Sequence, residues 1–164
     1  MRMDKLTSKF QLALADAQSL ALRYENNFIE PEHVLMAFLN QEGGTVVPLL
    51  SKALVNTSLL KSLINQALEK LPKVSGVGGE LHISNALNSL LNMTEKLAQQ
   101  QKDQFISSEL FIVAAMDAKS TLAKLLKQAG AETNAINKAI LELRGGEQVS
   151  DANAEEKRQA LEKY

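Results

Sequence analysis

The chain of 164 residues has no cysteine and no tryptophan, and aromatic residues make up only 4% of it. Without cysteine it forms no disulfide and offers no thiolate to a metal or a substrate, and we expect a reducing compartment. An apolar content with few aromatic residues, dominated by leucine, alanine and isoleucine, favours helices over sheets. Eighteen basic and nineteen acidic residues give a net charge of −1. Such a surface has no general attraction for nucleic acid or an anionic membrane.

Long apolar stretches are also lacking. Residues 10–22 follow several basic side chains, as a secretory signal would, but Gln11, Asp16, Gln18 and Ser19 interrupt them. Nothing approaches the ~20 apolar residues of a membrane span. We therefore expect a cytoplasmic protein that has neither nucleic acid nor a membrane as a partner.

What the sequence does contain is an internal repeat. Residues 28–32 read Phe-Ile-Glu-Pro-Glu and align with residues 105–109, Phe-Ile-Ser-Ser-Glu, at an offset of 77 positions. The offset holds without a gap over residues 6–42 and becomes 76 after a one-residue deletion near Ser120. Each position in one copy therefore has an equivalent position in the other.

Each copy has the apolar spacing of four helices. We expect the first helices to follow the N-caps Thr7 and Ser84, the second to begin at Pro31 and after Ser107, and the last to end at Gly145. The other expected helices cover residues 46–52, 58–71, 122–128 and 134–144. The predicted fold class is all-α, with two tandem four-helix repeats forming a pseudo-twofold helical domain.

The predicted organisation has four parts. They are a first repeat at residues 1–71, a linker at 72–82, a second repeat at 83–146, and a segment at 147–164 that leads out of the domain. Proline and glycine mark the linker. In the last part, residues 147–153 are polar and expected to be mobile, whereas residues 154–164 have a helix-forming composition.

Side chains suited to catalysis or metal binding are few. His33 and His82 have no cysteine or second histidine nearby, so we expect them to be solvated or to cap helices. Ser84 lies two residues from His82 at a helix start, which does not make a nucleophile with its base. The glycines at 76–79 lack the spacing of a dinucleotide fingerprint, and no P-loop motif occurs. We therefore expect a binding module with no catalytic residue, no metal and no cofactor of its own.

Several stretches together carry a resemblance to a known family. They are residues 1–7 (MRMDKLT), 10–18 (FQLALADAQ), 29–35 (IEPEHVL), 40–44 (NQEGG), 105–111 (FISSELF), 144–146 (RGG) and 158–164 (RQALEKY). In these stretches the chain resembles the tandem Clp N-terminal repeat of bacterial ClpB-type disaggregases. The second copy departs from the histidine signature, because Leu110 stands where the first copy has His33.

The resemblance implies the substrate-binding N-terminal domain of a chaperone that pulls unfolded or aggregated polypeptides out of aggregates together with the DnaK system. ATP and magnesium are then implied only for the full-length protein, a homohexamer, because the ATPase modules are not in this chain. The isolated domain is expected to be a monomer. The alternative is an adaptor-docking domain, as in the ClpA and ClpC unfoldases of ATP-dependent proteases, and one tightly bound folded partner would favour it. A third possibility is a structural role that modulates the ATPase of the ring.

The repeat also separates shared positions from divergent ones. Met93 and Leu110 are apolar, but their equivalents in the first copy, Asp16 and His33, are polar. Such residues, extended by Leu91 on the same helix, would form an exposed apolar groove for substrate. The alternative is that they pack against the other repeat.

Four polar residues flank this candidate groove: Thr7, Ser84, Asp103 and Glu109. The resemblance implies that they take part in substrate engagement, because they match family positions associated with it. Each also has a structural explanation. Thr7 and Ser84 would cap helices, Asp103 would be a loop charge and Glu109 a charge in the first turn of a helix.

Overall fold

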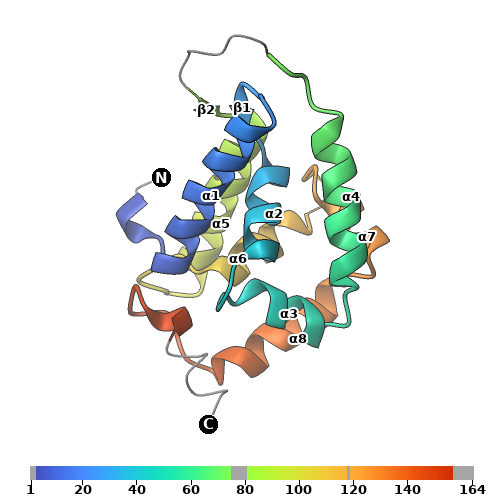
Figure 1. Ribbon diagram of the computed structural model, residues 1–164. Coiled ribbons are helices and arrows are strands. Elements are labelled where there is room, and N and C mark those ends of the chain that lie inside the picture. Colours follow the sequence, from blue (N-terminus) through green and yellow to red (C-terminus); the bar gives the residue numbers. More distant parts are fainter. Residues whose placement is uncertain (1–2, 75–80, 118, 157–164) are drawn as a thin grey trace.

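The computed structural model describes residues 3–74, 81–117 and 119–156 (Figure 1). Its helices are α1 (Ser8–Arg23), α2 (Pro31–Asn40), α3 (Val46–Lys52), α4 (Thr57–Glu69), α5 (Asn85–Gln100), α6 (Ser108–Ala115), α7 (Ala123–Gln128) and α8 (Thr133–Arg144). A 3₁₀ turn, η1 (Met3–Lys5), precedes α1, and two short strands are β1 (Phe28–Ile29) and β2 (His82–Ile83). The all-α prediction is confirmed.

Local sequence signals place most of the helix ends. The Thr7 hydroxyl accepts the Phe10 N–H at 3.3 Å, and the Ser84 hydroxyl accepts the Leu87 N–H at 3.0 Å, so both predicted N-caps are confirmed. At the end of α8, Gly145 takes the left-handed conformation with φ 58°, which glycine adopts at little cost. The largest error is at α4, which ends at Glu69 instead of residue 71.

A pseudo-twofold relation links the two copies. Ile29 pairs with Ile83 in the parallel β1–β2 ladder, and Leu6 forms a parallel bridge with Ile106. The offset of 77 converts the first pairing into the second. In each case the segment between the first two helices of one copy pairs with the segment before the first helix of the other copy. The repeats are therefore interlocked.

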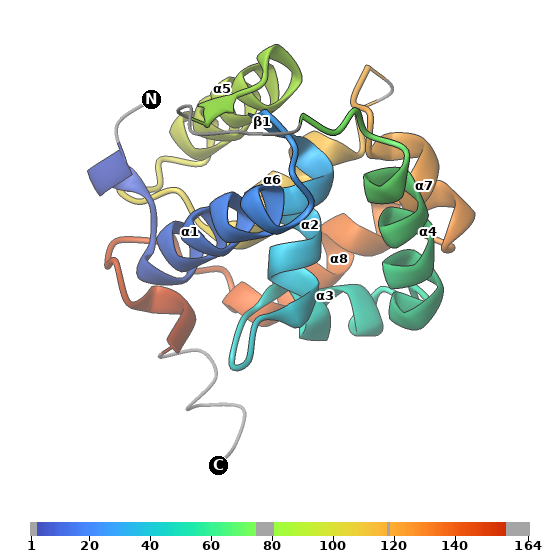
Figure 2. The ribbon, with the colours of Figure 1, turned by 45° about the horizontal axis from the view of Figure 1, so that its top comes forward.

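Helix packing follows the same relation. α3 packs against α8 and α4 against α7, so the third helix of each copy contacts the fourth helix of the other. Figures 1 and 2 show α2 and α6 in the middle of the domain, with α1 and α5 to one side and α4 and α7 to the other. All of α6 except Val113 is buried, as the uninterrupted apolar run over residues 110–116 predicts.

Three phenylalanines join the copies at the centre of the core. Phe10 on α1 and Phe38 on α2 belong to the first copy, and Phe111 on α6 belongs to the second. Their ring centroids are 5.4 Å apart for Phe10 and Phe38, 5.9 Å for Phe10 and Phe111, and 5.4 Å for Phe38 and Phe111. These are favourable aromatic separations. The core is therefore one body to which both repeats contribute.

His33 caps its own helix from a buried position. Its Nδ1 accepts the Glu30 N–H at 2.8 Å, and its Nε2 lies 2.8 Å from Asn26 Oδ1. Because Nδ1 is an acceptor, the ring is neutral and Nε2 carries the proton that is donated to Asn26. Burial lowers the pKa of His33 to about 4. Of the two predicted roles for this residue, capping is confirmed and solvation is wrong.

Acidification is expected to destabilise the domain through His33. The unfolded chain takes up a proton near pH 6.5, whereas the folded chain keeps the ring neutral down to about pH 4. The stabilisation is therefore complete above pH 6.5 and is lost as the pH falls to 4, to a total of about 3 kcal/mol. Urea unfolding of the wild type and of His33→Gln at pH 7 and pH 4.5 checks this. An equal loss of stability in both proteins would contradict it.

Candidate functional site

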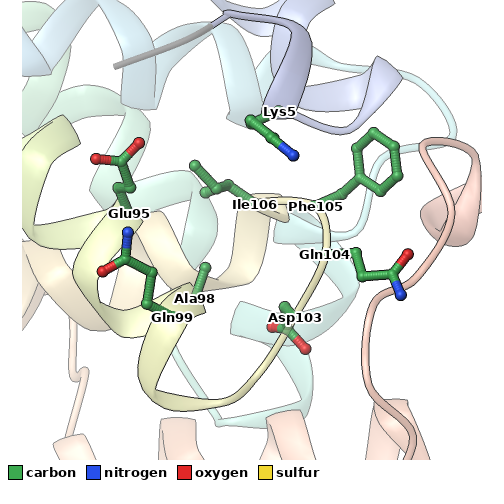
Figure 3. Close-up of a pocket in the computed structure, with 8 residues that line it drawn as sticks. All are labelled: Lys5, Glu95, Ala98, Gln99, Asp103, Gln104, Phe105 and Ile106. Atoms are coloured by element: carbon green, nitrogen blue, oxygen red, sulfur yellow. The ribbon is translucent and has the colours of Figure 1, made fainter.

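One cleft of about 530 Å³ lies between η1, α5 and the loop before α6 (Figure 3). Lys5 enters it from η1, Glu95 and Gln99 from α5, and residues 103–106 line the loop side. The Asp103 carboxylate is already engaged, since it accepts the Val149 N–H at 2.9 Å. This surface mixes charges of both signs with apolar groups, and its lining residues do not pair a nucleophile with a base.

A second cleft, of about 320 Å³, lies between α5, the first residue of α2 and the end of α6 with the loop that follows it. We call it the α5 cleft. Its apolar residues are Pro31, Ala86, Leu90, Met93 and Ala114, and its polar residues are Ser89, Asp117, Lys119, Ser120 and Thr121. Met93 is half-buried. The apolar side chains and a rim with both charges suit an apolar ligand.

In the first copy the equivalent space is filled. The Gln41 side chain donates to the Lys9 carbonyl at 2.8 Å, and a Cβ added to Gly44 would lie only 2.4 Å from Gln41 Oε1. Lys9 and Gly44 are the equivalents of Ala86 and Ser120, which line the α5 cleft. The Gln41 side chain therefore lies across the space that is open in the second copy.

The three apolar residues of the candidate groove separate into core and surface. Leu91 is 3% exposed and Leu110 is 0% exposed, and both belong to the common core. Their expected place on an exposed patch is therefore wrong. Leu110 was expected at the surface because its equivalent, His33, is polar, but every residue of α6 except Val113 is buried. Leu91 was expected only as an extension of the patch on α5, and its equivalent in the first copy, Leu14, is a core residue as well. Met93 is the one of the three that lines the α5 cleft.

Asp103 and Glu109 belong to a buried ion cluster around Arg144. The Arg144 guanidinium contacts Glu109 Oε2 at 2.9 Å and Asp103 Oδ2 at 3.0 Å, and it donates to Ser107 Oγ at 3.0 Å. The side chains of both acids are 0% exposed. The structural explanations expected for them, a loop charge and a first-turn charge, are therefore incomplete, because the sequence showed no long-range partner. Ser84 is a buried helix cap, as expected.

Thr7 has a second partner besides its cap, Glu155. The Thr7 hydroxyl donates to Glu155 Oε2, which also accepts the Ser108 N–H at 3.2 Å and the Ser108 hydroxyl at 2.9 Å. Burial, together with the nearby carboxylate of Glu109, raises the pKa of Glu155. The carboxylate therefore joins the start of α1 to the start of α6 in the other copy.

The rest of the segment from 147 to 156 is also docked. Val149 is 3% exposed and its carbonyl accepts the Gln104 N–H at 2.7 Å, while the Ser8 N–H donates to the Ala152 carbonyl at 2.9 Å. The stretch expected to be mobile, residues 147–153, is therefore held at Val149 and Ala152 by backbone partners that its polar composition did not indicate. Residues 157–164, for which a helix was expected, lie outside the described residues, as does most of the expected linker, residues 75–80.

Residues 3–74, 81–117 and 119–156 contain no group of three or more His, Cys, Asp or Glu placed to hold a metal ion. Within the same ranges, no helix is long and apolar enough to cross a membrane.

The arrangement of the repeats agrees with a family model described as the Clp repeat (R) N-terminal domain, which matches residues 5–155. The chain belongs to this family. The chaperone protein ClpB of Vibrio cholerae is 48% identical to this Clp repeat domain over 164 residues, which is 100% of this chain and 19% of that protein. The chain therefore spans about a fifth of the length of that relative.

Solved structures of similar fold extend the comparison. The Hsp104 N-terminal domain from Candida albicans has a TM-score of 0.81 and 23% identity, covering 92% of this Clp repeat domain and 99% of that chain. A complex of the ClpV N-domain with a VipB peptide has a TM-score of 0.70 and 21% identity, covering 85% and 86%. At these identities the likeness shows the fold. The pseudo-twofold helical fold is that of Clp and Hsp104 N-domains.

Proposed function

We propose that this Clp repeat domain is the substrate-binding N-terminal domain of a ClpB-type protein disaggregase. It engages unfolded or aggregated polypeptides through the α5 cleft, and the rest of the protein extracts them by hydrolysing ATP. The observation that carries the proposal is an apolar cleft open on the second copy of a domain whose curated relative is a ClpB. Its floor is formed by side chains such as Leu90 and Met93, which an exposed apolar segment of a client contacts.

The chemistry of the cleft fits weak and sequence-tolerant binding. Burying one large apolar side chain contributes about 1.5–3 kcal/mol, so a cleft of this size holds one or two such side chains with low affinity. The charged rim residues Asp117 and Lys119 are exposed and of opposite sign, so they select little by charge. Several copies of the domain on a hexameric ring would raise the overall avidity for one long client.

The remaining features of the proposal concern the full-length protein. We extend the proposal, on the basis of the likeness to ClpB, to ATP and magnesium, a homohexamer, cooperation with the DnaK system and a cytoplasmic location. The related ClpV N-domain has been solved with a VipB peptide, which supports peptide binding by this fold. Since the V. cholerae relative is a ClpB, we favour the disaggregase over adaptor docking on a ClpA- or ClpC-type unfoldase.

Replacing Met93 with aspartate is expected to weaken binding of an unfolded polypeptide at least tenfold. The variant places a carboxylate, which loses hydration on binding, against the apolar client side chain. The measurement is fluorescence anisotropy with a labelled, permanently unfolded polypeptide. Leu12→Asp is the matched control, because Leu12 is a 55% exposed leucine on α1 of the first copy. An equal loss in both variants, or no loss in Met93→Asp, would contradict the proposal.

A further inference from the structure

We infer that Pro31 and Glu32 set the side-chain class that the α5 cleft accepts: it takes an apolar side chain and rejects the carboxylate that the equivalent place in the first copy holds. The inference rests on the proposed function for the identity of the ligand, a client polypeptide. The difference between the α5 cleft and the place that holds the Glu155 carboxylate does not depend on that function, because it lies in the residues of the domain.

The two places correspond residue by residue. In the first, the Glu155 carboxylate accepts from Thr7 before α1, from Ser108 at the first position of α6, and from Thr45 in the loop before α3. The equivalents of Ser108 and Thr45 are Pro31, at the first position of α2, and Thr121. Both line the α5 cleft. One end of the cleft is therefore the counterpart of the place that Glu155 occupies.

Of the three residues that donate to the Glu155 carboxylate, only Thr7 keeps an available equivalent here, the hydroxyl of Ser84. Pro31 has neither an N–H nor a hydroxyl, whereas Ser108 supplies both. The Thr121 hydroxyl donates to Glu32 Oε1 at 3.1 Å, so it is already engaged. A carboxylate that enters the α5 cleft would lose its hydration without gaining these bonds, which is costly.

The charge beside the two places differs as well. Glu109 stands next to Glu155 but is paired with Arg144. The equivalent of Glu109 is Glu32, and the equivalent of Arg144 is the buried Leu68. Glu32 therefore lacks the arginine that compensates its counterpart, and its charge repels a second carboxylate.

The docked segment also indicates how a client lies. The Ser8 N–H, at the first position of α1, donates to the Ala152 carbonyl, and the side chain three residues later, that of Glu155, enters the first place. The equivalent N–H on α5 is that of Asn85. A client bound in the same way places a carbonyl at Asn85 and an apolar side chain, three residues later, against Pro31 and Leu90.

Two short peptides test the inference on the whole chain. One has the sequence of residues 147–156, and the other carries Glu155→Leu. In an NMR titration of the wild type we expect the leucine peptide to shift the signals of Leu90, Met93 and Thr121 and to bind at least tenfold more tightly there than the acidic peptide. In the double variant Pro31→Ser, Glu32→Gln we expect the preference to move toward the acidic peptide by at least tenfold. Displacement of the chain's own Glu155 by a peptide is followed separately, from the signals of Thr7 and Ser108.

The reverse substitution gives a second measurement that does not depend on the double variant folding. Ser108→Pro keeps a residue suited to the first helical position but removes the two bonds that Ser108 donates to Glu155, leaving those of Thr7 and Thr45. Faster hydrogen exchange at the Ser8 amide is expected, because the Ala152 carbonyl would undock. Equal binding of the two peptides by the wild type, or unchanged exchange at Ser8 in Ser108→Pro, would overturn the inference. The proposed function is tested by a different result. It would be contradicted if an unfolded polypeptide also left the NMR signals of the α5 cleft unchanged.

Discussion

Replacing Arg144 with methionine is expected to lower the free energy of unfolding by about 3–5 kcal/mol. The Arg144 side chain is 6% exposed, and its guanidinium contacts Asp103 and Glu109, whose side chains are fully buried. Methionine fills much of the volume but leaves two carboxylates without a counter-charge in a place of low polarity. Breaking such a cluster from one side costs more than the cluster itself contributes, because the remaining charges stay desolvated.

Urea unfolding followed by circular dichroism measures the effect. The matched control is Lys52→Met, which removes an exposed ion pair with Glu142, 3.3 Å long, whose side chains are 42% and 48% exposed. Exposed pairs contribute about 0–1 kcal/mol, so this variant should remain near the wild type. Similar losses in the two variants would show that the Arg144 cluster is no more important than a surface pair.

Truncating Phe111 to alanine is expected to lower the free energy of unfolding by about 3–5 kcal/mol. The ring belongs to the second copy but packs on Phe10 and Phe38 of the first copy. Its removal therefore opens a cavity at the junction of both repeats. Because the repeats share this core and exchange their strand pairings, we expect one transition with a lower midpoint.

Comparison of two probes tests this cooperativity. Circular dichroism reports the helices of both copies. In a Tyr164→Phe background Tyr24 is the one remaining tyrosine of the sequence, and its fluorescence reports the first copy. Leu141→Ala is the control, because Leu141 is 67% exposed and its truncation should change stability little. Two separate transitions in Phe111→Ala would contradict a single shared core.

Much of the fold followed from local chemistry. The caps at Thr7 and Ser84, Pro31 at the start of α2 and Gly145 at the end of α8 act within one turn of themselves, so the sequence displays them directly. The strands β1 and β2 were not predicted, because two residues are too few to show an alternating pattern.

The long-range polar contacts could not be predicted either, because no local pattern in the sequence indicates them. Arg144 and Asp103 are far apart in sequence, as are Glu155 and Thr7, and nothing in their neighbourhoods indicates that they meet. Comparing the two copies came closer to the site, since it singled out Met93 against Asp16. It did not separate Met93 from Leu110, because a side chain that lines a cleft and one that fills a core are both apolar. Gln41, which fills the first copy's space, has no pattern of its own.

Duplication accounts for the fold that the two copies share, and their later divergence accounts for the difference between their surfaces. The first copy uses Gln41 to fill its space and binds Glu155 beside it. The second keeps the equivalent space open and lines it with Met93 and Leu90. Duplication thus gives a fold whose core is built by both copies, and substitutions at a few positions leave an open cleft on the second copy.

A methyl NMR titration of the wild-type domain with a permanently unfolded polypeptide tests the role of the α5 cleft most directly. Shifts concentrated at Met93 and Leu90, with none at the exposed Leu12 of the first copy, are the expected result. Shifts of similar size on both copies, or shifts confined to the cleft around Lys5 and Phe105, would contradict a client site on the second copy alone.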